Sequence, residues 1–557
     1  MRVGMRLWRS KREGEISADS SRMPVGAVNH WGVSQYLVVM SGECERETSA
    51  AHRGLELLLT NRFEECQRFL QEQNVKFPGR PRIQSLYALT VFVKGIVTFG
   101  KAELDESLKC MWAAELVGRG SPTVEGKLVQ GETHLLGALI QILQESYVKA
   151  AWNLKKSRRM YDEAAVMLET YEGVDKDDLK SGIQFGLGVF NLFLSILPPS
   201  VVYVAGVLGF KSDRADGLRL LHESQSGGHL FSPVSALCLL SYFVQISTHI
   251  GSQTEADLDR ASQIIAWAGS RIPNSFFFLY FASRLHRTRA EMSQALSSLT
   301  VAMDVAGSMP AFRQLISYEL AWCNFIQLQF TDAAEHLERI LVEGGITKNS
   351  NIRGFYMYHR GICLLCAGKD EIAMECFNDV PGLITGKLRP MDSYCLRKAS
   401  QFTKKAGGCV LDAFELLLVW NAFPSMSHDV SMTALELLDD ELRRYGSTSW
   451  SVGDQLRYHT YRAYIYSSNG NTGAAEREYK VVFEDSRSLD PRANADGVVA
   501  WAWTTYALWK VKAGDLDLAE AAHERASSYN DFDLYKLLTF RLYSLKQTIL
   551  AKRQAGQ

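Results

Sequence analysis

The sequence predicts an all-α fold, an α-solenoid in which antiparallel helix pairs stack one upon another. Three observations support this prediction. The 557 residues include only 13 prolines, and most glycines fall at apparent turn positions. The chain is 46% hydrophobic, which is typical of a folded soluble protein. Most directly, one spacing of small and bulky residues recurs along the chain, as it does in helical repeat proteins.

The recurring spacing is that of a tetratricopeptide unit, two helices in about 34 residues. A small residue on the first helix is followed after twelve positions by a second small residue, after four more by a bulky one, and after three more by a small or apolar one. The copies begin at Gly54, Gly95, Ser283, Ala321, Gly361, Ala463 and Ala507. Because successive units lie more than 34 residues apart, we expect an irregular tetratricopeptide-repeat superhelix.

The repeats divide the chain into five predicted segments. Residues 1–47 are expected to be a disordered arm, since they contain no apolar run long enough for a signal peptide. An N-terminal helical block with degenerate repeats and a Gly/Pro apolar hairpin covers 48–260. Central repeats occupy 261–385, a basic connection 386–410, and C-terminal repeats 411–557.

Turn residues mark the boundaries between predicted helices. Asn469-Gly470-Asn471 and Gly514-Asp515 separate the two helices of the C-terminal units, and Pro273-Asn274 ends the helix before the first central unit. Glycine adopts the left-handed backbone conformation that such turns need, and asparagine or aspartate begins the next helix well.

Two stretches, 181–210 and 224–254, contain no Asp, Glu, Lys or Arg. Each is long enough to cross a bilayer, for which about 20 apolar residues suffice. Glycines and prolines split the first into two short apolar segments, Phe185–Leu197 and Val201–Phe210, and polar residues shorten the second. We interpret both as buried core helices, and a membrane-seated hairpin is the alternative.

Neither the cysteines nor the motifs indicate catalysis. Ten cysteines are too few and too unevenly spaced for a disulfide framework, which favours a reducing, cytoplasmic location. Cys363 and Cys366 form one C-x-x-C in an apolar helical stretch, where a core role is favoured over metal or redox use. Phosphate-loop, zinc-protease, nucleophile-elbow and EF-hand motifs are absent from the sequence. We therefore predict no enzyme, no cofactor and no metal.

The overall charge excludes nucleic acid as a partner, but local clusters of Lys and Arg remain candidate contacts for an anionic surface. The 61 Lys and Arg residues against 62 Asp and Glu give a net charge of −1, so no global field holds a polyphosphate. Lys155, Lys156, Arg158 and Arg159 form a basic cluster beside a helical stretch. This cluster is a candidate contact for an anionic membrane or lipid-droplet surface, and the alternative is a solvated face.

A second basic cluster lies in the predicted connection. Its candidate contacts for an anionic surface are Lys387, Arg397 and Lys398, and acidic residues are scarce around them. A plain interdomain linker is the alternative for this segment.

Function is then expected from the shape of the repeats. Stacked helix pairs generate a concave surface on which the first helices present a groove for a peptide. We therefore predict a scaffold that binds protein or peptide clients without chemical turnover. Candidate groove residues are polar or aromatic positions on first helices: Tyr318, Tyr358, Arg360, His459 and Arg462.

Several segments resemble the tetratricopeptide repeat protein 39 family. They include Gly188-Val-Phe-Asn-Leu-Phe-Leu-Ser-Ile-Leu-Pro198, Phe278-Leu-Tyr-Phe281-Ala-Ser-Arg284 and Glu319-Leu-Ala-Trp322-Cys323. The likeness runs from about residue 48 to the end, and the C-terminal third, with Leu417-Leu-Val-Trp420, is most similar to the C-type branch.

The resemblance implies a cytosolic helical-repeat adaptor without known catalytic residues. Fungal relatives are linked to lipid droplets, clearance of protein inclusions and the outer mitochondrial surface, and the animal C-type branch to cilium assembly. It thus implies a place at the cilium base, or, as the alternative, a peripheral membrane or lipid-droplet adaptor that acts in lipid handling or inclusion clearance.

Overall fold

The computed structural model describes residues 48–98, 100–144, 146–197, 212–307, 309–343, 351–402, 409–446, 450–486 and 497–555. Within these ranges all regular elements are helices and no strand is present, so the predicted all-α fold is confirmed. Residues Glu47–Gln557 form one compact unit. The segments predicted from the repeats are thus parts of one body, and their boundaries stay predictions. The arm predicted over residues 1–47 lies outside the described residues.

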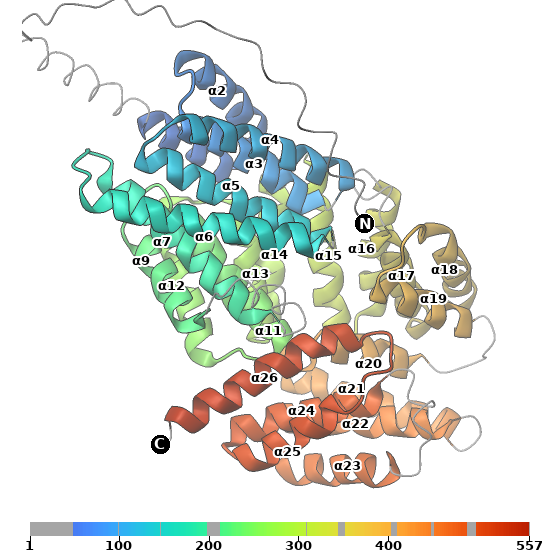
Figure 1. Ribbon diagram of the computed structural model, residues 1–557. Helices are drawn as coiled ribbons and strands as arrows, with labels where there is room; N and C mark the ends of the chain where they lie inside the picture. The colour runs from blue at the N-terminus through green and yellow to red at the C-terminus, as the bar shows by residue number, and fades with distance from the viewer. Residues whose placement is uncertain are drawn as a thin grey trace, which may run out of the picture. The chain divides into compact units, whose positions relative to one another are not determined.

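The first part of the chain is a series of long helices (Figure 1). A helix over residues 48–59 comes first. It is followed by α2 (Phe63–Lys76), α3 (Pro81–Thr98), α4 (Lys101–Gly120), α5 (Val124–Leu143), α6 (Tyr147–Glu169), α7 (Lys176–Ile196), α9 (Arg214–Ser226), α10 (Ser232–Ser241), the π-helix η1 (Tyr242–Ile246), α11 (Ser247–Ile250) and α12 (Glu255–Arg271).

The central and C-terminal parts are built mainly from helix pairs. The central helices are α13 (Phe276–Thr288), α14 (Met292–Ala306), α15 (Pro310–Ile326), α16 (Phe330–Glu343), α17 (Ile352–Cys366), α18 (Asp370–Leu383) and α19 (Pro390–Phe402). The C-terminal helices are α20 (Val410–Val419), the 3-10 helix η2 (Phe423–Ser425), α21 (His428–Glu441), the π-helix η3 (Leu442–Gly446), α22 (Val452–Ser468), α23 (Thr472–Asp485), α24 (Val498–Ala513), α25 (Leu516–Ser527) and α26 (Tyr535–Ala555).

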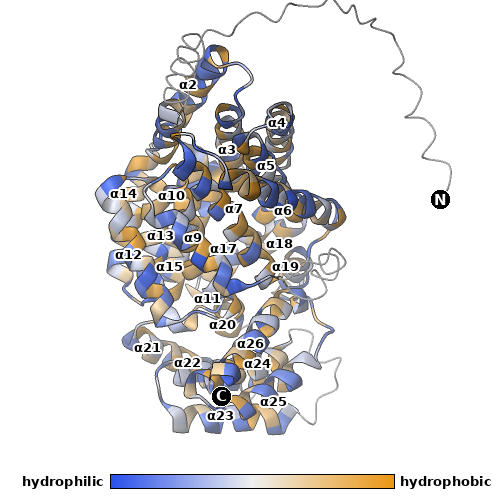
Figure 2. Cartoon of the chain, turned by 60° about the vertical axis from the view of Figure 1, so that its left-hand side comes forward, coloured by the Kyte–Doolittle hydropathy of each residue, from blue (hydrophilic) through white to orange (hydrophobic). Residues whose placement is uncertain are grey.

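The repeat positions predicted from the sequence lie where paired helices cross. In the α17–α18 pair a Cβ atom added at Gly361 would lie 2.6 Å from Cε1 of Phe377. At Gly54 the same atom would lie 2.7 Å from Cδ2 of Leu70. A real Cβ does not fit at these distances, so the small residue lets the bulky one sixteen positions later fill the space between the helices. The hydropathy pattern of the helices is mixed, as packed amphipathic helices require (Figure 2).

The predicted turns are also confirmed. Gly470 and Gly514 have φ angles of 76° and 83°, the left-handed conformation that favours glycine. The side chains of Asn471 and Asp515 then accept hydrogen bonds from backbone N–H groups in the first turns of α23 and α25. One short segment therefore ends the first helix and begins the second.

The uncharged stretches contribute core helices. Two helices, Lys176–Ile196 and Ser232–Ile250, are long and apolar enough to cross a membrane, and 67% and 50% of their apolar windows are buried inside the protein. Phe190 of α7, for example, is fully buried. The described half of the predicted hairpin thus packs in the core, and its other half, Val201–Phe210, lies outside the described residues.

Arg541 of α26 joins the C-terminal helix to the middle of the chain. Its guanidinium donates hydrogen bonds of 3.1, 3.4 and 3.0 Å to the backbone carbonyls of His249, Leu418 and Val419, at the ends of α11 and α20. It also lies 4.9 Å from the ring centroid of Trp501. Burial lowers the pKa of Arg541 to about 10, which still leaves it charged at neutral pH. A cation at the C-terminal ends of two helices is favourable, because the partial charge there is negative.

The predicted basic connection is partly helical and contains a buried cation. Lys398 on α19 is 1% exposed and pairs with Asp412 at 3.1 Å and Glu415 at 2.6 Å, both on α20. Arg457 on α22 pairs with the same two carboxylates at 2.6 and 2.9 Å. We call these four residues the core cluster. Through this cluster Lys398 helps to tie α19, α20 and α22 together. The sequence had suggested that Lys398 faces an anionic surface, and this prediction is wrong because the side chain is buried. Residues 403–408 of the connection lie outside the described part.

Candidate functional site

The strongest candidate site is a cavity of about 290 Å³ where the central and C-terminal helices meet. The first helices of three successive repeats, α13, α15 and α17, contribute to its lining. Further lining residues come from α3, η1, α11, η2 and residues 420–422 between α20 and η2. First helices are the ones from which the repeat pattern predicts a client groove, and π-helical turns such as η1 are frequent at functional sites.

Two arginines on one turn of α13 meet a single carboxylate in this cavity. Arg284 Nη1 lies 2.5 Å from Oε1 of Glu319 on α15, and Arg287 Nη1 donates to Oε2 of the same residue. Arg284 also donates to the Tyr280 hydroxyl at 2.7 Å, and this hydroxyl lies 3.2 Å from Glu319 Oε1. We call these four residues the cavity cluster. With two guanidinium groups and one carboxylate, it carries a surplus positive charge.

The protonation states within the cavity follow from burial and from the arginines. Burial alone would raise the pKa of Glu319, but the charges of Arg284 and Arg287 hold it below its ordinary value. Burial raises the pKa of Tyr280 to about 12. Burial, followed by the charges of Arg541, Arg284 and Arg287, lowers the pKa of His249 to about 3. At neutral pH, therefore, Glu319 is ionised while Tyr280 and His249 are uncharged.

Aromatic rings also line the cavity. The ring centroids of Tyr318 and Tyr356 lie 5.1 Å apart, those of His249 and Trp420 4.8 Å, and those of Trp322 and Trp420 6.1 Å. Such surfaces bury apolar groups and flat polar groups at low entropic cost. The cavity thus combines a cationic cluster with a set of aromatic rings.

No metal site accompanies this arrangement. Throughout the part of the chain that the structure describes, no group of three or more His, Cys, Asp or Glu side chains could hold a metal ion. Cys363 and Cys366 both lie on α17, and burial raises the pKa of each thiol well above its ordinary value. The cavity is suited to holding a ligand by charge and by aromatic contact.

The central groove residues predicted from the sequence are separated in the structure. Tyr318 lines the cavity. Tyr358, in contrast, is fully buried, with its ring 6.0 Å from that of Phe377 and 5.8 Å from that of Tyr394, so it is a core residue and not the exposed groove residue that we expected. Arg360 pairs with Glu338 on α16 at 2.9 Å and is not part of the cavity lining.

The C-terminal groove residues form a separate ion-pair group. His459 Nδ1 and Arg462 Nε on α22 lie 2.6 and 2.9 Å from the two carboxylate oxygens of Glu478 on α23. Arg462 also pairs with Asp439 on α21. Burial tends to raise the pKa of Glu478, but hydrogen bonds from His459 and Arg462 lower it. The group joins three helices, and neither predicted residue lines the central cavity.

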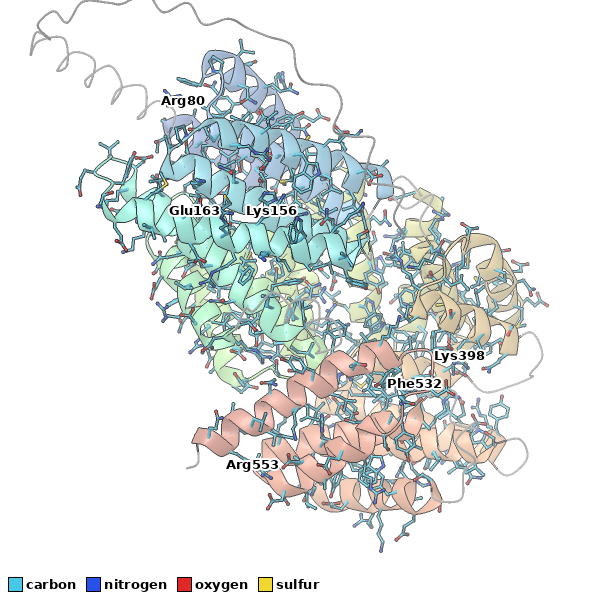
Figure 3. All side chains as sticks on the ribbon, in the orientation of Figure 1. Arg80, Lys156, Glu163, Lys398, Phe532 and Arg553 are labelled. Carbon is cyan, nitrogen blue, oxygen red and sulfur yellow. The ribbon has the colours of Figure 1, made fainter. Side chains whose placement is uncertain are left out.

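The first basic cluster lies on α6, where Figure 3 labels Lys156 and Glu163. Lys155 and Lys156 are exposed. Arg158 and Arg159 form pairs with Asp162 and Glu163, four residues further along the helix, at 2.9 and 2.7 Å. Part of the predicted positive charge is therefore neutralised locally.

The second basic cluster does not stay together. Lys387 is exposed, whereas Arg397 Nε lies 2.7 Å from Oδ2 of Asp533, just before α26, and Lys398 belongs to the core cluster. Two of its three cations thus hold helices in place.

Most residues of the cavity were not predicted as site residues. Tyr280, Arg284 and Glu319 lie in segments that resemble a known family but were not predicted to form a site, and neither were Arg287 and His249. The available signal was a charged residue within an otherwise apolar helical stretch, as in Glu319-Leu-Ala-Trp322. A charged side chain is buried only when it has a partner of opposite charge. A charged residue in an apolar helix therefore indicates the face that packs against a helix carrying that partner.

Comparison with known proteins gives a consistent family assignment. The model of the Iml2/Tetratricopeptide repeat protein 39 family matches residues 52–449. Tetratricopeptide repeat protein ttc-39B of Caenorhabditis elegans is 22% identical over 596 aligned residues, which cover 97% of this chain and 98% of that protein.

Solved structures match at lower similarity. A Rap protein complexed with competence and sporulation factor is 11% identical, with a TM-score of 0.34, and the match covers 72% of this chain and 97% of that one. The human IFIT1 dimer with m7Gppp-AAAA is 14% identical, with a TM-score of 0.31 and coverage of 77% and 94%.

Proposed function

The chain belongs to the Iml2/tetratricopeptide repeat protein 39 family, and on this basis we propose that it is a non-catalytic scaffold that binds a protein or peptide client. The client would contact the first helices of the central repeats and insert a side chain or a chain end into the cavity between α13, α15 and α17. Function then lies in holding the client, with no bond made or broken.

One observation carries this proposal: the cavity opens where repeat architecture places a client. Part of its lining comes from the first helices of three consecutive repeats, and it combines ionised groups with aromatic rings. Helical-repeat proteins use such first-helix surfaces to bind extended or helical segments. Pockets with a few convergent polar groups in a mostly apolar wall are the usual form of a binding site.

Site-specific photo-crosslinking in cells tests the proposal. A photoreactive phenylalanine analogue at Tyr318 should capture the same client protein in repeated experiments, identified by mass spectrometry. The matched control carries the analogue at Tyr147, a tyrosine that is 45% exposed on α6. Capture of the same proteins from both positions, or of none from position 318, would refute binding at the cavity.

The location of the scaffold in the cell is a further part of this proposal. From the sequence resemblance of the C-terminal third to the C-type branch, we propose that the scaffold acts in cilium assembly in the cytoplasm, at the cilium base. Imaging of the tagged full-length chain in ciliated cells tests this, since the scaffold should concentrate at the base of the cilium. Even distribution through the cytoplasm would contradict the cilium role and leave client binding unaffected.

A second candidate function, contact with an anionic membrane or lipid-droplet surface, is favoured by the outer face of α6. Val148 is 77% exposed and Trp152 58% exposed, one helical turn apart. Lys155 Nζ lies 5.7 Å from the Trp152 ring centroid, and Lys156 is exposed beside it. Tryptophan and lysine together are typical of surfaces that contact lipid headgroups.

Flotation with liposomes tests this second candidate. The full chain should float with phosphatidylserine-containing liposomes and not with pure phosphatidylcholine, and Trp152→Glu should abolish flotation. The matched control is Leu518→Glu, at a position 45% exposed on α25, which should float like the unmodified protein. Failure of the unmodified protein to float would remove this candidate.

A further inference from the structure

We propose that the cavity recognises an anionic group, a carboxylate or a phosphate, on a short peptide segment of the client, with a neighbouring apolar side chain packed on the aromatic wall. This inference rests on the proposed scaffold function and names the chemistry of its client. It assigns Arg284 and Arg287 as the anion contacts and Trp322, Tyr356 and Trp420 as the wall.

The charge balance of the cavity points to an anion. Among the residues that line it, the ionised side chains are Arg284, Arg287 and Glu319. One carboxylate shared by two guanidinium groups leaves one positive charge uncompensated. A third guanidinium, that of Arg541, donates at 3.1 Å to the backbone carbonyl of His249, whose side chain lines the cavity. A surplus cation in a partly dehydrated site attracts an anion far more strongly than the same cation in water.

Hydrogen-bond donors remain available for that anion. A guanidinium carries five N–H donors. Arg284 uses Nη1 for Glu319 and Tyr280, and its buried Nε has no hydrogen-bond partner among the described residues. Arg284 and Arg287 are each only 14% exposed, so their orientation is fixed by packing before a ligand arrives. Planar, pre-oriented guanidinium groups match carboxylate and phosphate oxygens well.

The size of the cavity favours a peptide anchor over a large cofactor. Its volume of about 290 Å³ lies at or below the lower end of the roughly 300–1,000 Å³ range of small-molecule pockets. One anionic side chain or chain terminus fits, together with part of a neighbour. The aromatic rings of the lining give that neighbour a surface to pack on, which a free inorganic anion would leave unused.

Other charged clusters do not offer the same chemistry. In the core cluster both cations are paired with carboxylates at short range, and Asp454 lies 3.3 Å from Arg457 as a third carboxylate, so no surplus positive charge is present. The pocket beside Trp267 has the cations Arg219, Arg260 and Arg271, but all three are exposed, so none supplies a buried donor without a partner as Arg284 does. Only at the central cavity do surplus charge, an unused buried donor and an aromatic wall occur together in the part of the chain that the structure describes.

Binding of peptide libraries to the purified full-length chain tests the inference. The probes are three synthetic hexapeptide libraries that differ at one fixed position, which is glutamate, phosphoserine or glutamine, with mixed residues elsewhere. We expect the glutamate or the phosphoserine library, or both, to be retained at least tenfold better than the glutamine library. The two anionic arms distinguish a carboxylate from a phosphate source. Peptides with a free or an amidated C-terminus separate a terminal carboxylate from a side chain.

Charge variants locate the binding. Arg287→Gln should lower retention of the anionic library at least tenfold, whereas Glu319→Gln, which adds to the surplus charge, should raise it. Gln245→Glu places a negative charge on an exposed residue of the cavity lining without removing any ion pair, so it should lower retention in a folded protein. Arg271→Gln, at the exposed pocket beside Trp267, is the matched control and should bind as the unmodified chain does.

The outcomes separate this inference from the scaffold function. Equal retention of all three libraries, retention of none, or anion binding that Gln245→Glu leaves unchanged would each overturn the inference. If Tyr318 crosslinking still captures a client in those cases, the scaffold function stands with a different ligand chemistry. If crosslinking fails while Gln245→Glu weakens anion retention, the cavity binds an anion but not a protein client.

Discussion

The core cluster and the cavity cluster both pair basic side chains with carboxylates, but the two arrangements differ in charge and in exposure to an open space. In the core cluster, Lys398 and Arg457 meet Asp412 and Glu415, and Arg457 also lies 3.3 Å from Asp454, so no cation there is in excess. In the cavity cluster two arginines share Glu319 and border an open space. A closed network without surplus positive charge fixes the relative positions of helices, whereas an open one with surplus positive charge keeps part of its interaction capacity for a ligand.

Breaking the core cluster should have the largest effect. Lys398→Met removes a buried cation that pairs with both Asp412 and Glu415. We expect a loss of at least about 3 kcal/mol in the free energy of unfolding, because an uncompensated buried charge is costly. Urea denaturation followed by circular dichroism measures it. Lys155→Met, at an exposed position on α6, is the control, and a loss below about 1 kcal/mol for Lys398→Met would contradict the buried network.

Breaking the cavity cluster should cost less. Glu319→Gln keeps an oxygen acceptor but removes the charge that both arginines share. We expect a loss of about 2 kcal/mol, the range for hydrogen bonds to charged groups, since water in the cavity can solvate the arginines. The same denaturation experiment, with Glu415→Gln as the matched variant in the core cluster, ranks the two sites. A larger loss for Glu319→Gln would reverse the comparison.

Acidification should weaken the cavity region through His249. Its pKa is about 3 in the folded protein, against an ordinary value of about 6.5. As the pH falls below about 6.5, His249 becomes protonated in the unfolded chain but stays neutral in the folded protein. The free energy of unfolding therefore decreases. Between pH 7.5 and 5.5 we expect a loss of about 1 kcal/mol from this residue. Stability measured at both pH values should depend less on pH in His249→Phe, and an unchanged dependence would contradict this account.

An exposed ion pair supplies the smallest expected effect. Arg159 and Glu163 on α6 lie 2.7 Å apart, but Arg159 is 76% exposed. Arg159→Ala should change the free energy of unfolding by less than about 0.5 kcal/mol, because water competes for both charges. The measurement is the midpoint of urea denaturation. A loss comparable to that of Lys398→Met would show that burial is not what distinguishes the clusters.

The repeats were predictable because their signal is local. Gly361 and Phe377 lie sixteen positions apart in the sequence and meet across a single turn. Gly470 and Asn471 likewise act within a few residues of each other. Such features depend on backbone geometry and on the packing of helices that are neighbours in the sequence. The spacing of residues in a single sequence therefore predicts them.

The residues of the candidate site were harder to predict because helical phase decides them. Tyr356 lines the cavity while Tyr358, two positions later, is fully buried against Phe377. Each residue turns an α-helix by about 100°, so two positions reach the opposite face. Arg397 and Lys398 differ in the same way, since only Lys398 joins the core cluster. Which face meets which neighbour depends on long-range packing, and the spacing of apolar residues around these positions did not reveal it.

The contacts of Arg541 give the fold an order in time. Its carbonyl acceptors at His249 and Leu418 precede it by 292 and 123 residues. While the chain is being synthesised, these helix ends are made long before the guanidinium that binds them, so the growing chain can complete this junction only after residue 541 has been added. Until then the exposed helix ends have water, or a chaperone, as their partner.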